Sequence, residues 1–429
     1  MKRPLVITLL VLALLFVLAG IGAVVFFTVR NVGSFVLEQS YVSVTAEESK
    51  TLNVNDGPVN LVVKDGAGDV TVIGGDGDTV EVKVVKTGSA PTRARAEDDL
   101  NNIQYSISQD DNKITLTYSI DGIRTDHIDT VDFTVTVPVE TAVNIETSLG
   151  QVSVSDLNGD ATVMNDFGDV NVENITGALS VTSKSGTLKI NAIKASSQDV
   201  DINSGFGQVT VEQMSGRNIT ITSSSGTIEL NNIRATGDLQ TNSDFGNITY
   251  ENGSSASLDV GTKSGKVSIT KVNVRDELKI QNDFGEIELV QAMAGSYDLH
   301  TNSGSIDVDG AENSLKAHTD FGSITIKNAE STTLDLDTQS GTIEFSGSLG
   351  VGPHNVISDF GQIDLNFPAD SKLNVNLATD FGSISSEIPI TVVLDGKLER
   401  DTQEGTMNGG GDTLTVRTKS GDINIAAIE

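Results

Sequence analysis

A short motif recurs through most of this chain: a glycine followed by apolar residues at the second and fourth positions after it (Gly-x-Φ-x-Φ, where Φ is apolar). Examples are GQVSV at Gly150, GTIEL at Gly226 and GDINI at Gly421, and successive copies from Gly150 to Gly361 lie 18 to 21 residues apart. Alternating apolar residues are typical of half-buried β-strands, and a fixed period of this length is typical of stacked repeats. The repeat predicts an all-β fold, a parallel β-solenoid of about 20-residue coils, and the irregular coil length favours a right-handed helix.

Each glycine is expected at a turn between two short strands, because turns often need a positive φ that other residues resist. Two apolar residues before the glycine and two after it would share one face, which is buried when coils stack. Many of the residues three positions before the glycine are polar, such as Asn165, Thr301 and Thr338, and we interpret them as a structural ladder inside a corner. The predicted turn glycines are Gly150, Gly168, Gly186, Gly207, Gly226, Gly246, Gly265, Gly285, Gly304, Gly322, Gly341, Gly361, Gly382 and Gly421.

The residue directly before the glycine alternates between phenylalanine and serine in successive coils. Large and small residues in neighbouring layers fill a core without voids, so we predict that these phenylalanines form a core ladder. The alternation fails after Phe360, where the next copy has Phe381 and no serine coil lies between them in the sequence. The predicted core ladder consists of Phe167, Phe206, Phe245, Phe284, Phe321, Phe360 and Phe381.

Residues 5–29 form an uncharged, strongly apolar run that follows Lys2 and Arg3. About 20 apolar residues span a bilayer as a helix, and a positive N-terminal flank stays in the cytoplasm. We therefore predict a cytoplasmic start and transmembrane anchor at 1–30, a single-pass protein of the cell membrane, and an extracytoplasmic body. A cleaved signal peptide is the alternative, although its apolar region is usually shorter.

Composition shifts divide the rest of the chain. We predict a stalk at 31–50, an N-terminal β region or cap at 51–141 and a regular solenoid at 142–429. The cap contains an irregular insert, of which 87–102 is charged and able to form one short helix. A further irregular stretch is expected near 399–411, where apolar alternation stops.

The net charge of −31 argues against nucleic acid as a partner, because phosphate binding needs clustered basic residues. The chain has no cysteine, so disulfides and thiolate chemistry are excluded. None of the usual nucleophile or metalloprotease motifs occurs, and we predict that the chain is not an enzyme and needs no cofactor.

Two groups of residues have positions in the repeat that suggest a metal site. His300, His318 and Asp337 occupy the same place in three successive coils, as a zinc site would require, although an exposed polar ladder is the favoured interpretation. Asp359 and Asp380 fall in consecutive coils of the sequence and leave calcium open.

Residues 131–160 and the run of SG- or DFG-x-Φ-x-Φ repeats after them resemble the bacterial DUF4097 family of proposed adhesins, which is related to auto-transporter adhesin head domains. The resemblance covers roughly 59–429. It implies an N-terminal anchor and an extracytoplasmic β-repeat body, and it carries over no catalytic residue.

These observations favour a non-catalytic, membrane-anchored adhesin or surface-interaction protein, with a protein or glycan as its ligand and the membrane as a partner. An envelope-stress sensor or regulatory membrane protein is one alternative. A carbohydrate-active β-helix enzyme is another, because carboxylates are abundant.

Overall fold

The computed structural model describes residues 41–120, 128–392 and 401–428. The predicted membrane anchor at 5–29 lies outside these residues, as does the first half of the predicted stalk, 31–40. Within the described ranges, no helix has the length and apolar character needed to cross a bilayer.

The described chain divides into two units. The smaller unit comprises 41–46, 86–103 and 128–129, and its helix α2 (Arg93–Asn102) confirms the short helix predicted for the insert. Arg93 pairs with Glu97 one turn on at 2.9 Å. Strands β1 (Val42–Asn53) and β4 (Thr79–Ala90) contribute residues to both units, so the prediction of a stalk is wrong for 42–50.

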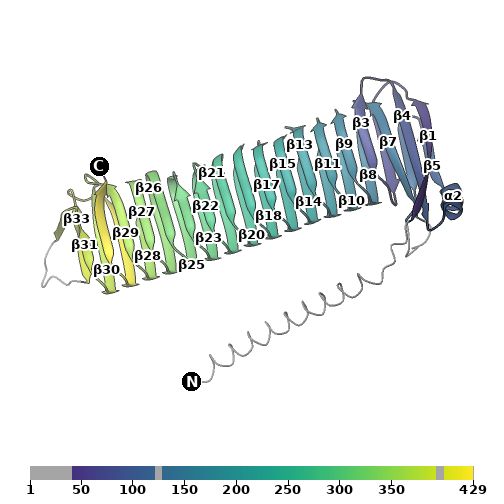
Figure 1. The fold of residues 1–429 in the computed structure, drawn as a ribbon. Coiled ribbons are helices and arrows are strands. Elements are labelled where there is room, and N and C mark those ends of the chain that lie inside the picture. Colours follow the sequence, from purple (N-terminus) through teal and green to yellow (C-terminus); the bar gives the residue numbers. More distant parts are fainter. Residues whose placement is uncertain (1–40, 121–127, 393–400, 429) are drawn as a thin grey trace, which may run out of the picture. The chain divides into compact units, whose positions relative to one another are not determined.

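The larger unit is a parallel β-solenoid, as the repeat predicts (Figure 1). Each coil contributes one strand to each of two rows. In the first row, β10 (Ala161–Phe167) lies in register between β8 (Thr141–Leu149) and β12 (Leu179–Ser185). In the second row, β11 (Val170–Ile175) lies between β9 (Val152–Leu157) and β13 (Leu188–Ala195).

Both rows continue in the same way. The first row proceeds through β14 (Val200–Phe206), β16 (Ile219–Ser225), β18 (Asp238–Phe245), β20 (Ser257–Ser264), the end of β21 (Val267–Phe284), β23 (Met293–Ser303), β25 (Glu312–Phe321), the end of β26 (Ile324–Ser340) and β28 (His354–Phe360). The second proceeds through β15 (Val209–Gly216), β17 (Ile228–Ala235), β19 (Ile248–Ser255), the start of β21, β22 (Ile287–Val290), β24 (Ile306–Asp309), the start of β26, β27 (Ile343–Leu349) and β29 (Ile363–Pro368).

The N-terminal end of the stack departs from chain order. Strand β2 (Val59–Asp65) lies between β8 and β6 (Lys113–Tyr118), and β3 (Val70–Gly75) lies between β9 and β7 (Thr130–Pro138), all parallel. The solenoid therefore begins at Val59, well before the predicted boundary at 142. Strand β5 (Tyr105–Asp110) pairs antiparallel with β6 and ends the parallel row.

The C-terminal end is also out of order. Strand β34 (Asp412–Ser420) is inserted between β28 and β30 (Leu373–Phe381), and β35 (Ile423–Ile428) between β29 and β31 (Ile384–Ser386). Where apolar alternation stops, β33 (Thr402–Met407) runs antiparallel to β30 and to β32 (Ile390–Val392). Antiparallel strands at an end occupy edge groups that would otherwise recruit another chain.

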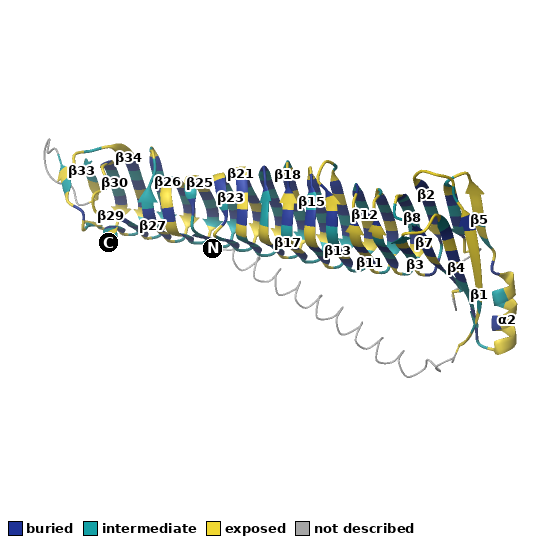
Figure 2. Ribbon diagram, turned by 90° about the horizontal axis from the view of Figure 1, so that it is seen from above, coloured by how far each residue is buried: buried dark blue, intermediate teal, exposed yellow. Residues whose placement is uncertain are grey.

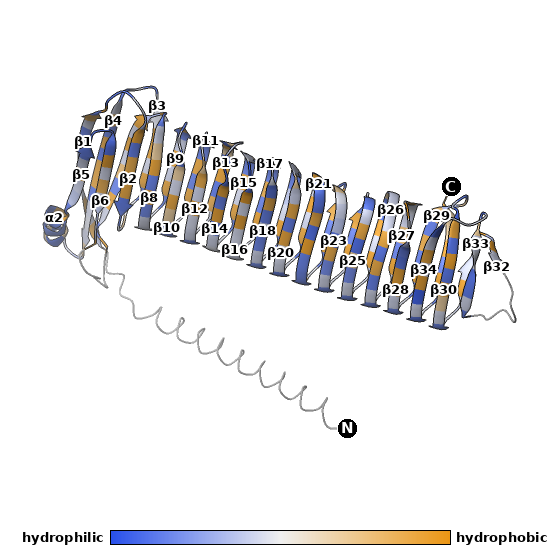
Figure 3. Ribbon diagram, turned by 180° about the vertical axis from the view of Figure 1, so that it is seen from behind, coloured by the Kyte–Doolittle hydropathy of each residue, from blue (hydrophilic) through white to orange (hydrophobic). Residues whose placement is uncertain are grey.

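The core is the continuous interior between the two rows. In one coil, Leu278, Ile280, Ile287 and Leu289 are all buried, as the alternation predicts. Buried and exposed residues alternate along the strands in Figure 2, and hydropathy follows the same banding in Figure 3. Stacking thus buries four apolar side chains per coil that no single coil could cover.

The predicted turn glycines are confirmed, and they stack into a column. A Cβ added at any of the fourteen would lie 1.8–2.1 Å from the carbonyl oxygen of the glycine on the neighbouring coil. At Gly285 this distance is 2.0 Å to the Gly265 oxygen, and φ is 154°. Close backbone approach, as well as φ, therefore requires glycine here.

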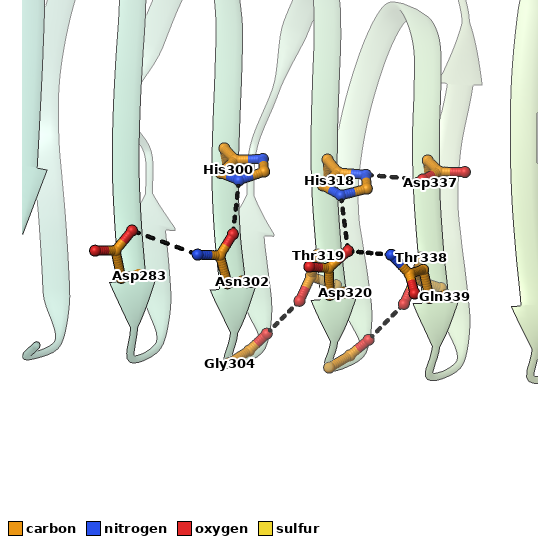
Figure 4. Close-up of polar contacts among 11 residues, drawn as sticks. Asp283, His300, Asn302, Gly304, His318, Thr319, Asp320, Asp337, Thr338 and Gln339 are labelled. Atoms are coloured by element: carbon orange, nitrogen blue, oxygen red, sulfur yellow. Dashed lines mark hydrogen bonds and ion pairs between the residues drawn. The ribbon is translucent and has the colours of Figure 1, made fainter. Parts of the chain in front are cut away.

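The polar ladder inside the glycine corner is also confirmed. Thr301 Oγ1 donates to the Gly285 carbonyl at 3.1 Å. Thr319 Oγ1 donates in the same way to the Gly304 carbonyl at 3.0 Å, as Figure 4 shows. Both threonines are buried. Their hydroxyls satisfy turn carbonyls that would otherwise be buried without a donor.

Asp65 occupies the same ladder position at the N-terminal end, aligned with Thr147. It is 3% exposed, and its Oδ1 accepts a hydrogen bond from the Ala67 amide at 3.2 Å. The pKa of the Asp65 carboxyl is raised to about 7: burial is the main cause, the charges of Asp132 and Asp69 add to it, and the hydrogen bond from the Ala67 amide opposes it. This carboxyl therefore remains protonated well above the ordinary range for aspartate.

Replacement of Asp65 by asparagine is expected to change how stability depends on pH. Because the folded pKa exceeds the unfolded value of 3.8, the stabilisation from the protonated group is complete below about pH 4 and is lost as pH rises to about 7. At pH 8 the asparagine variant should be more stable by roughly 4 kcal/mol, from the size of the pKa difference. Urea unfolding at pH 4 and pH 8 measures this. Asp56→Asn, at an exposed acid, is the control, and equal pH slopes in Asp65→Asn and the parent chain would refute the assignment.

Candidate interaction surface

The seven phenylalanines predicted to form a core ladder point outward instead. Their exposed fractions run from 55% at Phe167 to 80% at Phe381. The prediction extended strand alternation too far: each phenylalanine is the last residue of its strand, two positions after the buried ladder residue, and there the alternation of buried and exposed residues has ended. Phenylalanines inside the strands, such as Phe133 and Phe345, are fully buried.

These side chains form one row along the edge of the solenoid, which we call the phenylalanine ridge. Register pairs Phe167 with Ser185 and Ser185 with Phe206, and the same alternation continues along the stack. Ser420 of β34 lies between Phe360 and Phe381 and supplies the serine coil missing from the sequence order. The serines that alternate with the seven phenylalanines are Ser185, Ser225, Ser264, Ser303, Ser340 and Ser420.

Charged and polar side chains flank the ridge in a matching alternation. An aspartate precedes six of the phenylalanines, and a donor stands at that position in most of the serine coils. Lysine pairs with aspartate at 2.7 Å in each of Asp166–Lys184, Asp244–Lys263 and Asp359–Lys419. Asp283 accepts from Asn302 at 3.4 Å, and Asp320 accepts from Gln339 (Figure 4). Exposed pairs contribute little stability, but the three lysines neutralise three of the six aspartates beside the ridge.

The histidine column predicted from the sequence is confirmed in register: His300 pairs with His318, and His318 with Asp337. The two rings stack with centroids 5.0 Å apart. His318 Nδ1 lies 2.7 Å from Asp337 and Nε2 lies 3.4 Å from Asp320, whereas His300 Nε2 contacts Asn302 at 3.0 Å (Figure 4). The ring nitrogens face separate partners rather than one point, so the column has the form of a polar ladder.

The calcium alternative at Asp359 and Asp380 is wrong in its premise. Strand β34 separates the two coils, and Lys419 from that strand pairs with Asp359. In the described part of the chain, no group of three or more histidine, cysteine, aspartate or glutamate side chains is arranged to hold a metal ion.

A cavity of about 740 Å³ lies at the N-terminal end of the larger unit. Asp65, Glu146 and Asp166 line it, together with Lys64, which pairs with Glu146 at 2.9 Å. A buried acid of raised pKa beside a cavity is the kind of feature that catalytic sites use. Sequence reasoning missed it because the polar ladder was followed only through the regular repeat, whereas Asp65 lies three residues before Gly68 in the predicted cap; an acid at a ladder position was the available signal.

The sequence contained a signal for the ridge that was not used. Side chains that pack in a core need no charged neighbour, yet Asp-Phe-Gly places a carboxylate directly beside the phenylalanine. Lysine, asparagine or glutamine at the aligned place in the next coil completes the pattern, as at Lys263, Asn302 and Gln339.

A family model described as Toastrack DUF4097 matches residues 59–271 and 251–426, which together span nearly the whole described solenoid. No protein of curated function matches the chain.

Two solved structures match the chain at low identity. A candidate cell adhesion protein from Clostridium sporogenes is 9% identical over 90% of this chain and 100% of its own, with a TM-score of 0.21. A candidate adhesin from Bacteroides fragilis is 16% identical over 61% of this chain and 96% of its own, with a TM-score of 0.31.

Proposed function

Because the chain belongs to the Toastrack DUF4097 family, with a repeat body of the form described above, we propose that it is a non-catalytic surface-interaction protein of the adhesin class. Its contact surface is the phenylalanine ridge. The run at 5–29 anchors it as a single-pass membrane protein, with the N-terminus in the cytoplasm and the solenoid outside.

The single observation that supports this function is the exposure of seven phenylalanines in one row. Apolar residues scattered over a surface need no explanation, but a contiguous apolar strip marks an interaction site. A solenoid suits such a role, because each added coil lengthens the same surface without altering the fold.

The ridge also lies on a chain whose other features suit contact rather than chemistry. The net charge of −31 disfavours nucleic acid and anionic membrane surfaces as ligands. Three lysine–aspartate pairs beside the ridge halve the charge that its six flanking aspartates would otherwise carry, so an apolar partner meets less unpaired charge to desolvate.

The test uses cells that display the full-length chain, applied with and without calcium to surfaces coated with collagen, mucin, peptidoglycan or sister cells. A variant carrying Phe206→Ser, Phe245→Ser and Phe284→Ser should lose at least tenfold in retained cells on every surface that the parent binds. The matched control, Met164→Ser with Val351→Ser, removes exposed apolar residues outside the ridge and should bind as the parent does. Equal retention of the ridge variant and the control contradicts the proposal.

A second candidate function, a carbohydrate-active enzyme, is favoured by the cavity beside Asp65 alone. A protonated carboxyl near neutral pH is what a general acid requires. Release of reducing sugar from peptidoglycan by the full-length chain, abolished in Asp65→Asn, would move the assignment to that class.

A sensor role would instead require the native anchor, so exchange of 5–29 for an unrelated helix should abolish signalling but leave adhesion intact.

A further inference from the structure

The ridge has the shape of one half of a self-complementary contact. Adjacent parallel strands lie about 4.8 Å apart, so successive phenylalanines are roughly 9.6 Å apart, with a serine between them. A ring inserted over that serine would lie about 4.8 Å from the phenylalanines on either side, within the 4.5–7 Å range of aromatic pairs. Each gap over a serine therefore has the width that a phenylalanine from a second copy of the ridge would fill.

A second copy in antiparallel orientation fills every gap at once. If a two-fold axis passes between the coils of Ser264 and Phe284, each of these residues lies opposite the other in the second copy. The same operation sets every other phenylalanine opposite a serine, except Phe381, which meets Leu149, the residue aligned with Phe167 on the coil before it. The remaining opposed pairs are Phe167 with Ser420, Phe206 with Ser340, Phe245 with Ser303, Phe321 with Ser225 and Phe360 with Ser185.

Flanking charges agree with this register. The operation sets Asp283 opposite Lys263, Asp166 opposite Lys419 and Asp359 opposite Lys184. All three lysines of the ridge flank thus meet an aspartate of the other copy, in addition to the aspartate each contacts on its own chain. Contact between two copies of a chain with net charge −31 requires this kind of local compensation.

A parallel two-fold pair lacks these properties, since it would set phenylalanine against phenylalanine and leave holes between facing serines. A parallel pair shifted by one coil fills the holes but does not close by symmetry and would propagate. The seven rings expose on the order of 900 Å² per protomer, from about 200 Å² for a full aromatic side chain. A stable pair needs about 800 Å² per partner.

We propose that the phenylalanine ridge binds a second copy of this chain, antiparallel and in the register centred between Ser264 and Phe284. The proposal rests on the proposed function, since it names the partner of the same surface. The N-terminal ends of the two solenoids then lie at opposite ends of the pair. Anchors at opposite ends would join two apposed membranes, so the adhesion is between like cells.

The chain has no cysteine, so single cysteines report the register without background. Full-length chains reconstituted separately in lipid nanodiscs are mixed and treated with a short bismaleimide. Ser264→Cys should give at least ten times more crosslinked dimer than Ser185→Cys, whose two copies would lie about nine coils, or roughly 43 Å, apart in the pair. A mixture of Ser185→Cys and Phe360→Cys chains should crosslink to each other. Ser197→Cys, exposed and away from the ridge, is the background control.

Each other outcome overturns the proposal in a distinct way. Crosslinking of Ser185→Cys to itself as efficiently as Ser264→Cys shows a parallel arrangement. Crosslinking of all three single variants at the Ser197→Cys level shows that copies do not pair through the ridge. In that case, a loss of cell retention in the ridge variant on collagen, mucin or peptidoglycan keeps the proposed function and assigns the ridge to a foreign partner. The absence of both effects removes the pairing and the proposed function together.

Discussion

Replacement of Gly285 by valine is expected to destabilise the solenoid by at least about 4 kcal/mol, a loss that is exceptional for one substitution. A valine Cβ would lie 2.0 Å from the Gly265 carbonyl oxygen, and the backbone φ of 154° is one that β-branched residues resist. The neighbouring group is backbone held in a column of like turns, so it cannot move aside as a flexible side chain would. Thermal unfolding of the variant measures the loss.

The matched control is Glu286→Val, one residue further along the same turn. Its side chain is partly exposed and joins a surface ion pair with Lys266 at 3.3 Å. Loss of such a pair costs about 1 kcal/mol or less. If both valine variants unfold at the same temperature, the close backbone packing assigned to the column of turn glycines is refuted.

Truncation of Phe345 to alanine is expected to cost about 3–5 kcal/mol, because a fully buried aromatic leaves a cavity. Truncation of Phe284 should cost about 0.5 kcal/mol or less in dilute protein, because 63% of that side chain is already in water. The two residues have the same chemistry, so the comparison isolates the direction in which each points.

Urea unfolding at a protein concentration low enough to keep copies apart measures both variants. If Phe284→Ala loses as much stability as Phe345→Ala, the ridge residue faces the core and the interaction surface described here does not exist. At high concentration, the Phe284 variant should lose the extra stability that pairing gives to the parent chain.

The coil itself was predictable because its determinants are local. Alternation at Leu278, Ile280, Ile287 and Leu289 indicates two short strands with a shared buried face, and Gly285 marks the turn between them. Most coils also have a second bend, six residues after the glycine, which the sequence analysis did not predict. Residues six after the glycine, such as Asn174, Asn232 and Asn328, adopt a positive φ, and their preference for asparagine or glycine was the available signal.

The direction of the phenylalanines and the order of the end coils were not predictable in the same way. The alternation of buried and exposed residues stops before the last residue of the strand, so Phe284 points outward although it lies at an even spacing from buried Ile280. The insertion of β34 between Phe360 and Phe381 is a non-local choice, because a parallel strand pairs equally well with any coil of matching pattern. The sequence held two hints that this coil belongs between two aspartate coils: Ser420 precedes Gly421, as serine does in alternate coils, and Lys419 stands in place of the aspartate that precedes phenylalanine.

The most direct test of the ridge as the contact surface uses fluorescence of one tryptophan, since the chain has none. Full-length Phe284→Trp in nanodiscs should be quenched freely by acrylamide when dilute, and shielded when concentrated or bound to a surface that retains the parent cells. Val351→Trp, at an exposed site outside the ridge, should be quenched equally in every state. Shielding of Trp at position 284 in the dilute protein, or free quenching in every bound state, would contradict the account.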